Sequence, residues 1–352
     1  MLRILHAADL HLDSPFSSLS PELAAQRRRL QRTLPGQLSD LCSQYGCDLL
    51  LLAGDIFDGA LVCPETVRAL EEAFARCPAE VFIAPGNHDP YTADSPWSKV
   101  CWPKNVHVFT GPMEPVTLPE RSCRVWGAAF RGREARELLR PVPVGNDGFL
   151  EIGLVHGDPL HPGDYNYIPP RVLETCGLDY LALGHIHQAA LPRQAGKTWY
   201  GWPGTPMGRG FDETGEKGVF LVELEPGHCQ TRWLPIDGPR YEILEVPADR
   251  IAVPPELEGT VCRMVLTGES DGVDPEAVAR QYRDRFCALE VRDRTLPRQD
   301  LWSGCGDGTL RGLTLQALKQ QYDRAETPEE RQTAAQAARY ALAALEGRDL
   351  PW

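Results

Sequence analysis

Five short apolar runs in the first two hundred residues each end at a polar side chain of a type that binds metals. The runs cover residues 2–7, 49–53, 81–84, 150–155 and 180–183, and they lead to Asp9, Asp55, Asn87, His156 and His185. Stretches with helical spacing of apolar residues lie between them. Strands that alternate with helices predict an α/β layered core. Reactive groups in such cores gather where strands end, so the pattern predicts one site built from five segments.

The chain beyond residue 195 changes to strand-like segments at 197–202, 218–223 and 230–234, joined by glycine and proline turns. We interpret them as the far edge of the same sheets. Residues 235–239 are typical of a linker.

The remaining residues predict a small α+β cap and a helical tail. The cap has a strand at 261–266, a helix from Asp274 to about Phe286 and a strand at 288–292. In the tail, apolar residues from Leu310 to Tyr322 share one helical face, and Thr327 begins a second helix with a capping box. We therefore expect three parts, at 1–237, 238–295 and 296–352.

Composition restricts the function classes. The net charge of −13 argues against a broad basic face for nucleic acid, because phosphate contacts need clustered Lys and Arg. Eleven cysteines occur without a Cys-x-x-Cys pair, so we interpret them as reduced thiols. The sequence has no signal-peptide core and no apolar run of about 18 residues. We expect a cytoplasmic protein with no membrane partner.

The polar residues at the strand ends combine carboxylate and amide oxygens with imidazole nitrogens. Such a mixed set suits manganese, iron or zinc better than calcium or magnesium, which prefer oxygen alone. We expect two divalent ions, with Mn2+ favoured and Fe2+ or Zn2+ as alternatives. The candidate residues are Asp9, His11, Asp55, Asn87, His88, Asp89, His156, His185 and His187.

These motifs resemble the five blocks of the calcineurin-like metallophosphoesterases: Asp-x-His, Gly-Asp-x-x-Asp, Gly-Asn-His-Asp, His-Gly-Asp and Gly-His-x-His, all present in order. The resemblance implies a two-sheet αββα sandwich. It also implies ligand roles: one metal would be held by Asp9, His11 and His187, and a second by Asn87, His156 and His185. We call these the first-metal group and the second-metal group. Asp55 would bridge the two metals, because the two oxygens of a carboxylate can span two ions.

The same resemblance assigns the chemistry. A hydroxide that bridges the metals would attack phosphorus in line. His88 would stabilise the developing charge and protonate the leaving oxygen, with Asp89 orienting its ring. Asp58 takes a supporting role behind the ligands. Two divalent ions less two carboxylates leave about +2 at the site, which would attract a phosphate to an otherwise acidic protein.

Polar residues that have no ligand or catalytic role in these motifs have simpler interpretations. A lone histidine is usually a hydrogen-bonded core or surface residue, so we give no chemical role to His6, His107, His161 or His228. We assign Asp158 and Asp164 to turns.

The flanking sequence resembles the DNA-repair exonuclease branch, the SbcD-like and YhaO-like nuclease subunits. The informative stretch begins at Trp202-Pro-Gly-Thr and continues to Glu213-Thr-Gly-Glu-Lys-Gly218. The resemblance implies a DNA exo/endonuclease, a hydrolase that acts on ester bonds, beside an SMC-like ATPase that docks on the helical tail. Two alternatives stay open: a stand-alone phosphodiesterase on nucleotides, and a mainly partner-binding subunit. A homodimer through exposed helices also stays open.

Overall fold

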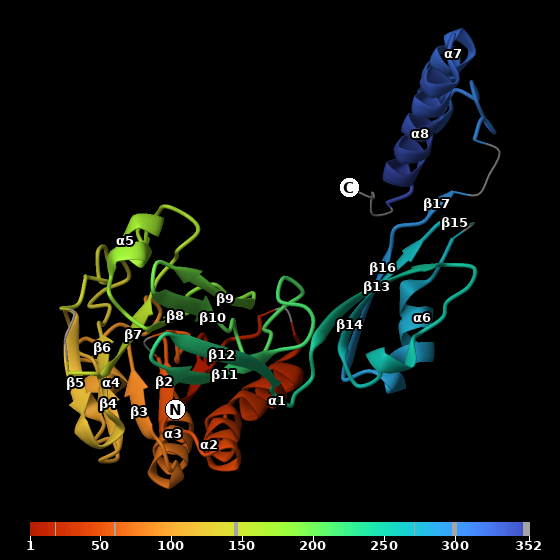
Figure 1. Ribbon diagram of the computed structural model, residues 1–352. Helices are drawn as coiled ribbons and strands as arrows, with labels where there is room; N and C mark the ends of the chain where they lie inside the picture. The colour runs from red at the N-terminus through yellow and green to blue at the C-terminus, as the bar shows by residue number, and fades with distance from the viewer. Residues whose placement is uncertain (18, 60, 144–146, 271, 298–300, 348–352) are drawn as a thin grey trace. The chain divides into compact units, whose positions relative to one another are not determined.

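The computed structural model describes residues 1–17, 19–59, 61–143, 147–270, 272–297 and 301–347. The chain divides into two compact units, Met1–Gly238 and Pro239–Trp352. The first unit contains two six-stranded sheets, with helices packed outside them (Figure 1). This arrangement confirms the predicted α/β sandwich. The three predicted domain boundaries stay predictions.

The first sheet has the strand order β12-β11-β1-β2-β3-β4. The strands β1, β2, β3 and β4 run parallel, and β4 forms one edge of the sheet. The strand β11 lies antiparallel to both β1 and β12. The strand bounds are β1 (Leu2–Ala7), β2 (Leu49–Leu52), β3 (Glu80–Ile83), β4 (Val106–Val108), β11 (Gly218–Glu225) and β12 (His228–Pro235). Its helices are α1 (Pro21–Gln31), α2 (Leu34–Tyr45), α3 (Pro64–Arg76) and α4 (Pro96–Lys99).

The second sheet has the order β5-β6-β7-β8-β10-β9, and its strands β6, β7, β8 and β10 run parallel. The bounds are β5 (Glu114–Leu118), β6 (Cys123–Gly127), β7 (Leu150–His156), β8 (Tyr180–Gly184), β9 (Ala190–Ala195) and β10 (Thr198–Trp202). The helix α5 (Pro170–Thr175) follows β7. The sequence did not predict β4, β5, β6 or β9.

Alternation along β2 shows how four leucines build two layers. Leu50 and Leu52 pack with residues of α2 and α3, whereas Leu49 and Leu51 pack with the second sheet, including Tyr180. Successive strand side chains point to opposite faces, so an apolar run fills the core on both sides. Burying each leucine contributes roughly 1.5–3 kcal/mol. The buried strands therefore fix the edge at which the polar residues emerge.

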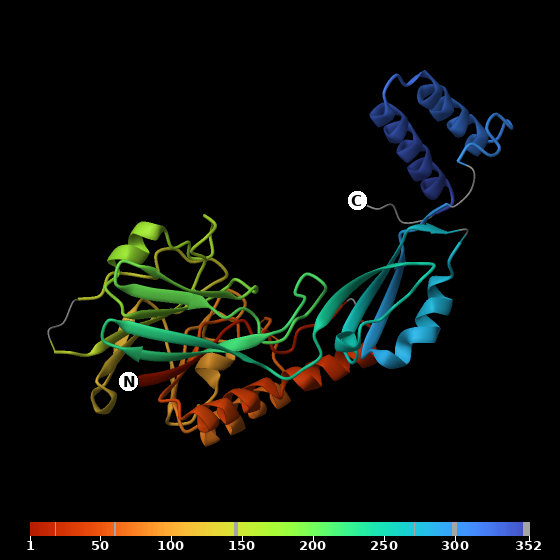
Figure 2. The same cartoon turned by 45° about the vertical axis from the view of Figure 1, so that its right-hand side comes forward.

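The second unit has a parallel sheet of β13 (Tyr241–Pro247), β14 (Val261–Thr267) and β16 (Ala288–Asp293), with α6 (Pro275–Tyr282) packed on β16. A short pair, β15 (Glu269–Ser270) and β17 (Leu296–Pro297), follows. The helices α7 (Leu310–Arg324) and α8 (Pro328–Leu345) form a hairpin (Figure 2). Thr327 and Glu330 form the predicted capping box. Among the described residues, no helix is long and apolar enough to cross a membrane.

Candidate metal centre

The carboxyl ends of five strands bring the predicted residues together. Asp9 follows β1, Asp55 follows β2 and Asn87 follows β3, whereas His156 ends β7 and His185 follows β8. The first three come from one sheet and the last two from the other, so the centre lies across the edge where both sheets end. Four of these residues are buried, and His185 is partly exposed.

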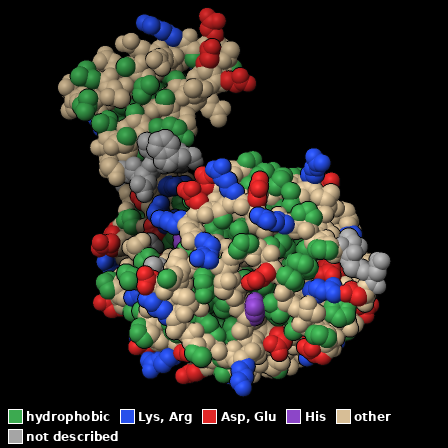
Figure 3. Space-filling model, turned by 90° about the vertical axis from the view of Figure 1, so that its left-hand side faces the viewer, with side chains coloured by type: hydrophobic (Ala, Val, Ile, Leu, Met, Phe, Trp, Pro, Cys, Tyr) green, Lys and Arg blue, Asp and Glu red, His purple; other side chains and the backbone are tan. Residues whose placement is uncertain are grey.

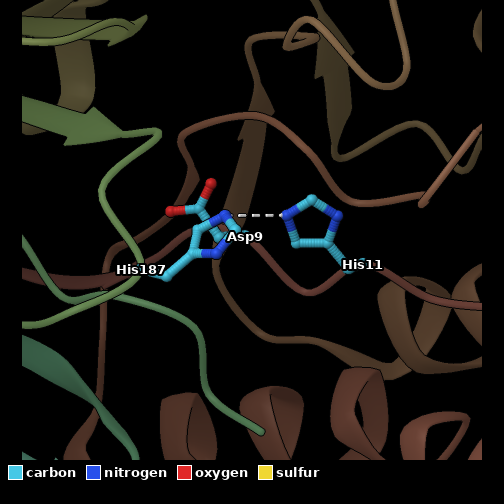
Figure 4. Close-up of side chains that lie close together, drawn as sticks. All are labelled: Asp9, His11 and His187. Atoms are coloured by element: carbon cyan, nitrogen blue, oxygen red, sulfur yellow. Dashed lines mark hydrogen bonds between the residues drawn. The ribbon is translucent and has the colours of Figure 1, made fainter. Parts of the chain in front are cut away.

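The first-metal group forms a compact cluster. Ligand atoms of Asp9, His11 and His187 all lie within 4.8 Å of one another. Figure 4 shows the two imidazoles facing each other beside the Asp9 carboxylate, with Nε2 of His11 3.1 Å from Nε2 of His187. Nδ1 of His11 lies 2.8 Å from Oδ1 of Asp58, and Nδ1 of His187 lies 2.8 Å from Oε1 of Glu213.

These contacts test whether the group fits a metal ion. A carboxylate is a pure acceptor, so each Nδ1 donates to its carboxylate when it carries the ring proton. Both Nε2 atoms then turn lone pairs toward each other, a contact that a cation between them would relieve. Carboxylates behind metal-bound histidines commonly fix this tautomer. The residues therefore fit a divalent cation.

In the second-metal group, the main chain orients the His156 ring instead. Nδ1 of His156 lies 2.9 Å from the carbonyl oxygen of Ala53, which leaves Nε2 for a ligand. That Nε2 lies 2.9 Å from Oδ1 of Asn87, and Nδ1 of His185 lies 3.3 Å from the same oxygen. One oxygen and two imidazole nitrogens thus converge in this group.

Asp55 lies between the two groups, but not in the expected way. Its Oδ2 atom is 3.8 Å from Nε2 of His11 and 3.4 Å from Nε2 of His156. Its Oδ1 atom accepts a hydrogen bond from the backbone N–H of His88 at 2.9 Å. We expected the two oxygens to span two ions. In the structure a single oxygen faces both groups, because the other is held by the backbone.

Charge at the centre calls for a cation. Burial lowers the pKa of His156, but Asp55 and Asp9 outweigh burial and raise it to about 9. Burial opposes ionisation of Asp55, yet His156 and His11 keep its pKa below the usual range. Without metal, the buried carboxylates therefore draw a proton onto an imidazole. A divalent ion would supply the positive charge directly.

The backbone at the ligands is strained. Asp9, His11, Asp55 and His185 have φ angles of 53°, 44°, 52° and 96°, a region that residues other than glycine rarely adopt. The backbone N–H groups of Asp9 and His11 donate to Gly54 and Asp55, and that of His185 donates to the Asp9 carboxylate. Neighbouring segments thus hold the ligands in conformations that cost about 1–3 kcal/mol each.

The structure corrects the role expected for Asp89. We expected its carboxylate to orient the His88 ring. Instead it accepts hydrogen bonds from the backbone N–H groups of Asp55, Ile56, Phe57 and Gly86, at 2.7–3.2 Å. Burial and the nearby Asp55 raise the pKa of Asp89 to about 7, although these donors oppose the rise. Asp89 therefore ties the Asp55 loop to the Asn87 loop.

His88 lies at the rim of the centre and contacts Asp58 instead of Asp89. Its Nδ1 is 3.3 Å from the backbone oxygen of Asp58, and its ring centroid is 4.9 Å from that of His11. Its side chain is 37% exposed, so a substrate can reach it. Ligand atoms of His11, Asp58 and His88 also lie within 4.8 Å of one another. In this second cluster Asp58 already contacts Nδ1 of His11, so its carboxylate is not free to bind a cation. We therefore regard the first-metal group as the better cation site.

Sequence reasoning missed two residues beside the first-metal group, Arg209 and Glu213. Both belong to the segment 203–217 between β10 and β11, which has no helix or strand. The Arg209 guanidinium donates to Oδ1 of Asp58 and Oε1 of Glu213, at 2.9 Å each. Glu213 lies in the stretch that resembles the exonuclease branch, but no motif indicates its role. Asp58 and Glu213 add two negative charges to the site, and Arg209 adds one positive charge.

The predicted simple role of His6 agrees with its contacts. The ring is buried, with Nδ1 2.9 Å from the Tyr180 hydroxyl and Nε2 3.0 Å from the Leu183 carbonyl oxygen. Burial lowers its pKa to about 3. His6 therefore links β1 to β8 as a neutral core residue.

The class of protein follows from this site and from comparison with known families. Residues 2–189 match the model of the calcineurin-like phosphoesterase family, which is more than half of the chain. The chain belongs to this family. Its two-sheet fold and its Asp/His cluster are those of a family that binds divalent metals.

Individual relatives include proteins named as nucleases. The chain is 32% identical over 245 residues to the uncharacterized metallophosphoesterase YhaO of Bacillus subtilis, which covers 64% of this chain and 58% of that relative. It is 25% identical over 303 residues to the probable exonuclease subunit 1 of Escherichia phage T5, covering 80% and 86%. It is 24% identical over 322 residues to the SbcD subunit of the nuclease SbcCD of Rhodobacter capsulatus, covering 75% and 76%.

Proposed function

We propose that this chain is a two-metal phosphodiesterase that cleaves DNA. The observation that carries the proposal is the pair of imidazole nitrogens of His11 and His187, 3.1 Å apart with a carboxylate behind each ring. Bound divalent ions, with Mn2+ favoured, would lower the pKa of a water molecule toward neutrality and neutralise phosphoryl oxygens. The Asp9 and Asp55 side chains would supply the anionic ligands.

The protein's own residues would complete the chemistry. His88 is the one motif histidine outside both metal groups, and it lies at the exposed rim beside His11. An imidazole there can donate a proton to the leaving oxygen of a phosphodiester. The hydrogen bond from the backbone N–H of His88 to Oδ1 of Asp55 would keep His88 at a fixed distance from the metals.

DNA is the proposed substrate because two relatives carry nuclease names. The net charge of the chain is −13, and acidic and basic side chains intermingle on the face of the first unit shown in Figure 3. The metal centre would then provide the local attraction for a phosphodiester. A role in DNA repair is part of the proposal.

We further propose that an SMC-like ATPase is the partner, with α7 and α8 as its docking segment. Two relatives are named as subunits, which supports a complex. Leu310 and Leu313 are 71% and 54% exposed on α7. An apolar helix surface of this kind suits a protein partner.

A direct test compares the full chain with its His88→Ala variant, each supplied with Mn2+, labelled linear DNA and bis-p-nitrophenyl phosphate. Loss of the general acid should lower kcat for DNA, whose leaving alkoxide needs a proton, by about 10²–10⁴-fold while two Mn2+ ions remain bound. Hydrolysis of bis-p-nitrophenyl phosphate should fall less, because nitrophenolate leaves without a proton. His161→Ala is a matched control, because His161 is an exposed histidine bonded to Asp158 and outside the centre. It should behave as the wild type.

The outcomes separate the alternatives. Hydrolysis of the small diester with intact DNA would contradict the nuclease proposal unless the ATPase restores cleavage, and would favour a phosphodiesterase on nucleotides. Hydrolysis of neither substrate, with Mn2+ bound, would favour a partner-binding subunit. Loss of a metal ion in His88→Ala would make His88 a ligand.

A further inference from the structure

The Arg209 side chain joins two carboxylates that stand behind different ligands of the first-metal group. Its Nη1 donates to Oδ1 of Asp58 at 2.9 Å, and Oδ1 of Asp58 contacts His11. Its Nη2 donates to Oε1 of Glu213 at 2.9 Å, and that oxygen contacts His187. One guanidinium thus connects both histidines of the group through their carboxylate partners.

The segment that carries Arg209 is itself held in place. The backbone N–H of Arg209 donates to Oε2 of Glu213 at 2.8 Å, so both oxygens of this carboxylate are used. The preceding carbonyl, of Gly208, accepts a hydrogen bond from the buried Arg27 of α1 at 2.8 Å. Thr205 donates its backbone N–H to the carbonyl oxygen of His187 at 3.0 Å. Residues 203–217 therefore reach the metal centre as an anchored loop.

We propose that Arg209 is a positioning residue, which fixes the His11 and His187 imidazoles for one of the two metal ions. This inference rests on the proposed function, since it assumes that both rings bind metal. A planar fork with donors on separate nitrogens can span two carboxylates, whereas an ammonium group offers donors from a single point. Outer partners of this kind commonly contribute 10–100-fold to metal affinity.

A competing effect has the opposite sign. The guanidinium is a cation, and Nη2 lies 3.0 Å from Nδ1 of His187, so its charge would repel a bound metal ion. Charge alone predicts tighter metal binding when Arg209 is removed. Positioning predicts weaker binding when the fork is lost but the charge is kept. Arg209→Lys separates the two effects, because lysine keeps the charge and loses the fork.

The experiment titrates the metal-free full chain with Mn2+ by calorimetry, for the wild type, Arg209→Lys and Arg209→Met. Arg124→Lys is the matched control: Arg124 is 22% exposed against 21% for Arg209, and it also joins two carboxylates, Asp147 and Glu151. We expect Arg209→Lys to bind one of two ions about 10-fold or more weakly. The affinity of Arg209→Lys for the other ion should be unchanged. Mn2+ binding by the Arg124→Lys control and the thermal unfolding of metal-free Arg209→Lys should also match the wild type.

Kinetics with bis-p-nitrophenyl phosphate supply a second readout. A positioning role predicts that saturating Mn2+ restores kcat in Arg209→Lys without a change in KM for the diester. Wild-type Mn2+ affinity in Arg209→Lys would overturn the inference. Tighter binding in Arg209→Met would then show that Arg209 acts through its charge. A raised KM at saturating Mn2+ would also overturn it, because Arg209 would then contact the substrate. No Mn2+ binding by the wild type would instead defeat the proposed function itself.

Discussion

The two halves of the metal centre are oriented by different parts of the protein. In the first-metal group, side chains do the orienting, because Asp58 and Glu213 contact the imidazoles of His11 and His187. In the second-metal group, the main chain does it, because Nδ1 of His156 contacts the carbonyl oxygen of Ala53. The position of the Ala53 carbonyl oxygen is set by the end of the strand and does not depend on which side chain occupies position 53. The Asp58 and Glu213 carboxylates, in contrast, can be replaced one at a time.

The difference teaches where the chain can tune its affinity for metal. The His156 ring of the second-metal group is oriented once β2 and β7 have formed, since Ala53 follows β2 and His156 ends β7. The first-metal group also depends on the loop 203–217, which has no helix or strand of its own. Substitutions in that loop should therefore alter one ion and spare the other.

The largest expected effect comes from Asp55, which serves both halves. Asp55→Ala removes the Oδ2 atom that faces His11 and His156. Both ions should be lost at Mn2+ concentrations that saturate the wild type, because a buried cation site without its central carboxylate is poorly neutralised. Metal content after dialysis measures this directly. Two ions retained in the variant would refute the bridging position of Asp55.

An intermediate effect is expected for Glu213→Gln, which should act on one half only. A neutral amide orients the His187 ring less firmly than the carboxylate, so one of two Mn2+ ions should bind about 10–100-fold more weakly. Calorimetric titration with Mn2+ gives the two affinities. Glu151→Gln is the control, since Glu151 is also a buried glutamate with an arginine partner, and it lies within β7. Equal weakening of both ions would contradict the separation of the halves.

The smallest effect on metal is expected from Asn166, which supports the main chain behind His156. Its Nδ2 donates to the His156 carbonyl oxygen at 2.8 Å, and its Oδ1 accepts from the backbone N–H of Leu138 at 2.9 Å. Asn166→Gly, which tolerates the φ of 54°, should lower the free energy of unfolding by about 1–3 kcal/mol. Urea denaturation measures this loss, and Mn2+ titration should show a smaller change than Glu213→Gln. The opposite order would mean that the main chain tunes affinity more than the carboxylates do.

Much of the fold could be predicted because the parallel strands are apolar on both faces. β1 was predicted with the bounds that the structure has, and the other motif strands differ by a residue or two. The missed strands lie at or near sheet edges, where exposure removes that pattern. β9, for example, includes Pro192 and Arg193 and alternates between partly buried and exposed residues.

The candidate site could be predicted as a set of residues, but not in its contacts. Sequence order places a polar residue after each strand, which was enough to bring Asp9 and His187 together. It cannot tell whether the Asp89 carboxylate turns to the His88 ring or to backbone N–H groups, because both lie within reach of the same loop. Nor could it bring Arg209 to Asp58, since 151 positions separate them and no motif joins them.

The positive φ angles at four ligands have a consequence for how this protein is dissected by mutation. Asparagine and aspartate tolerate that backbone region better than alanine does. An alanine at Asp9 or Asp55 therefore reports the lost ligand and a rise in backbone energy together. Asp9→Asn and Asp55→Asn keep the conformation and remove only the charge. For this centre, asparagine variants remove the charge without the backbone cost that alanine adds.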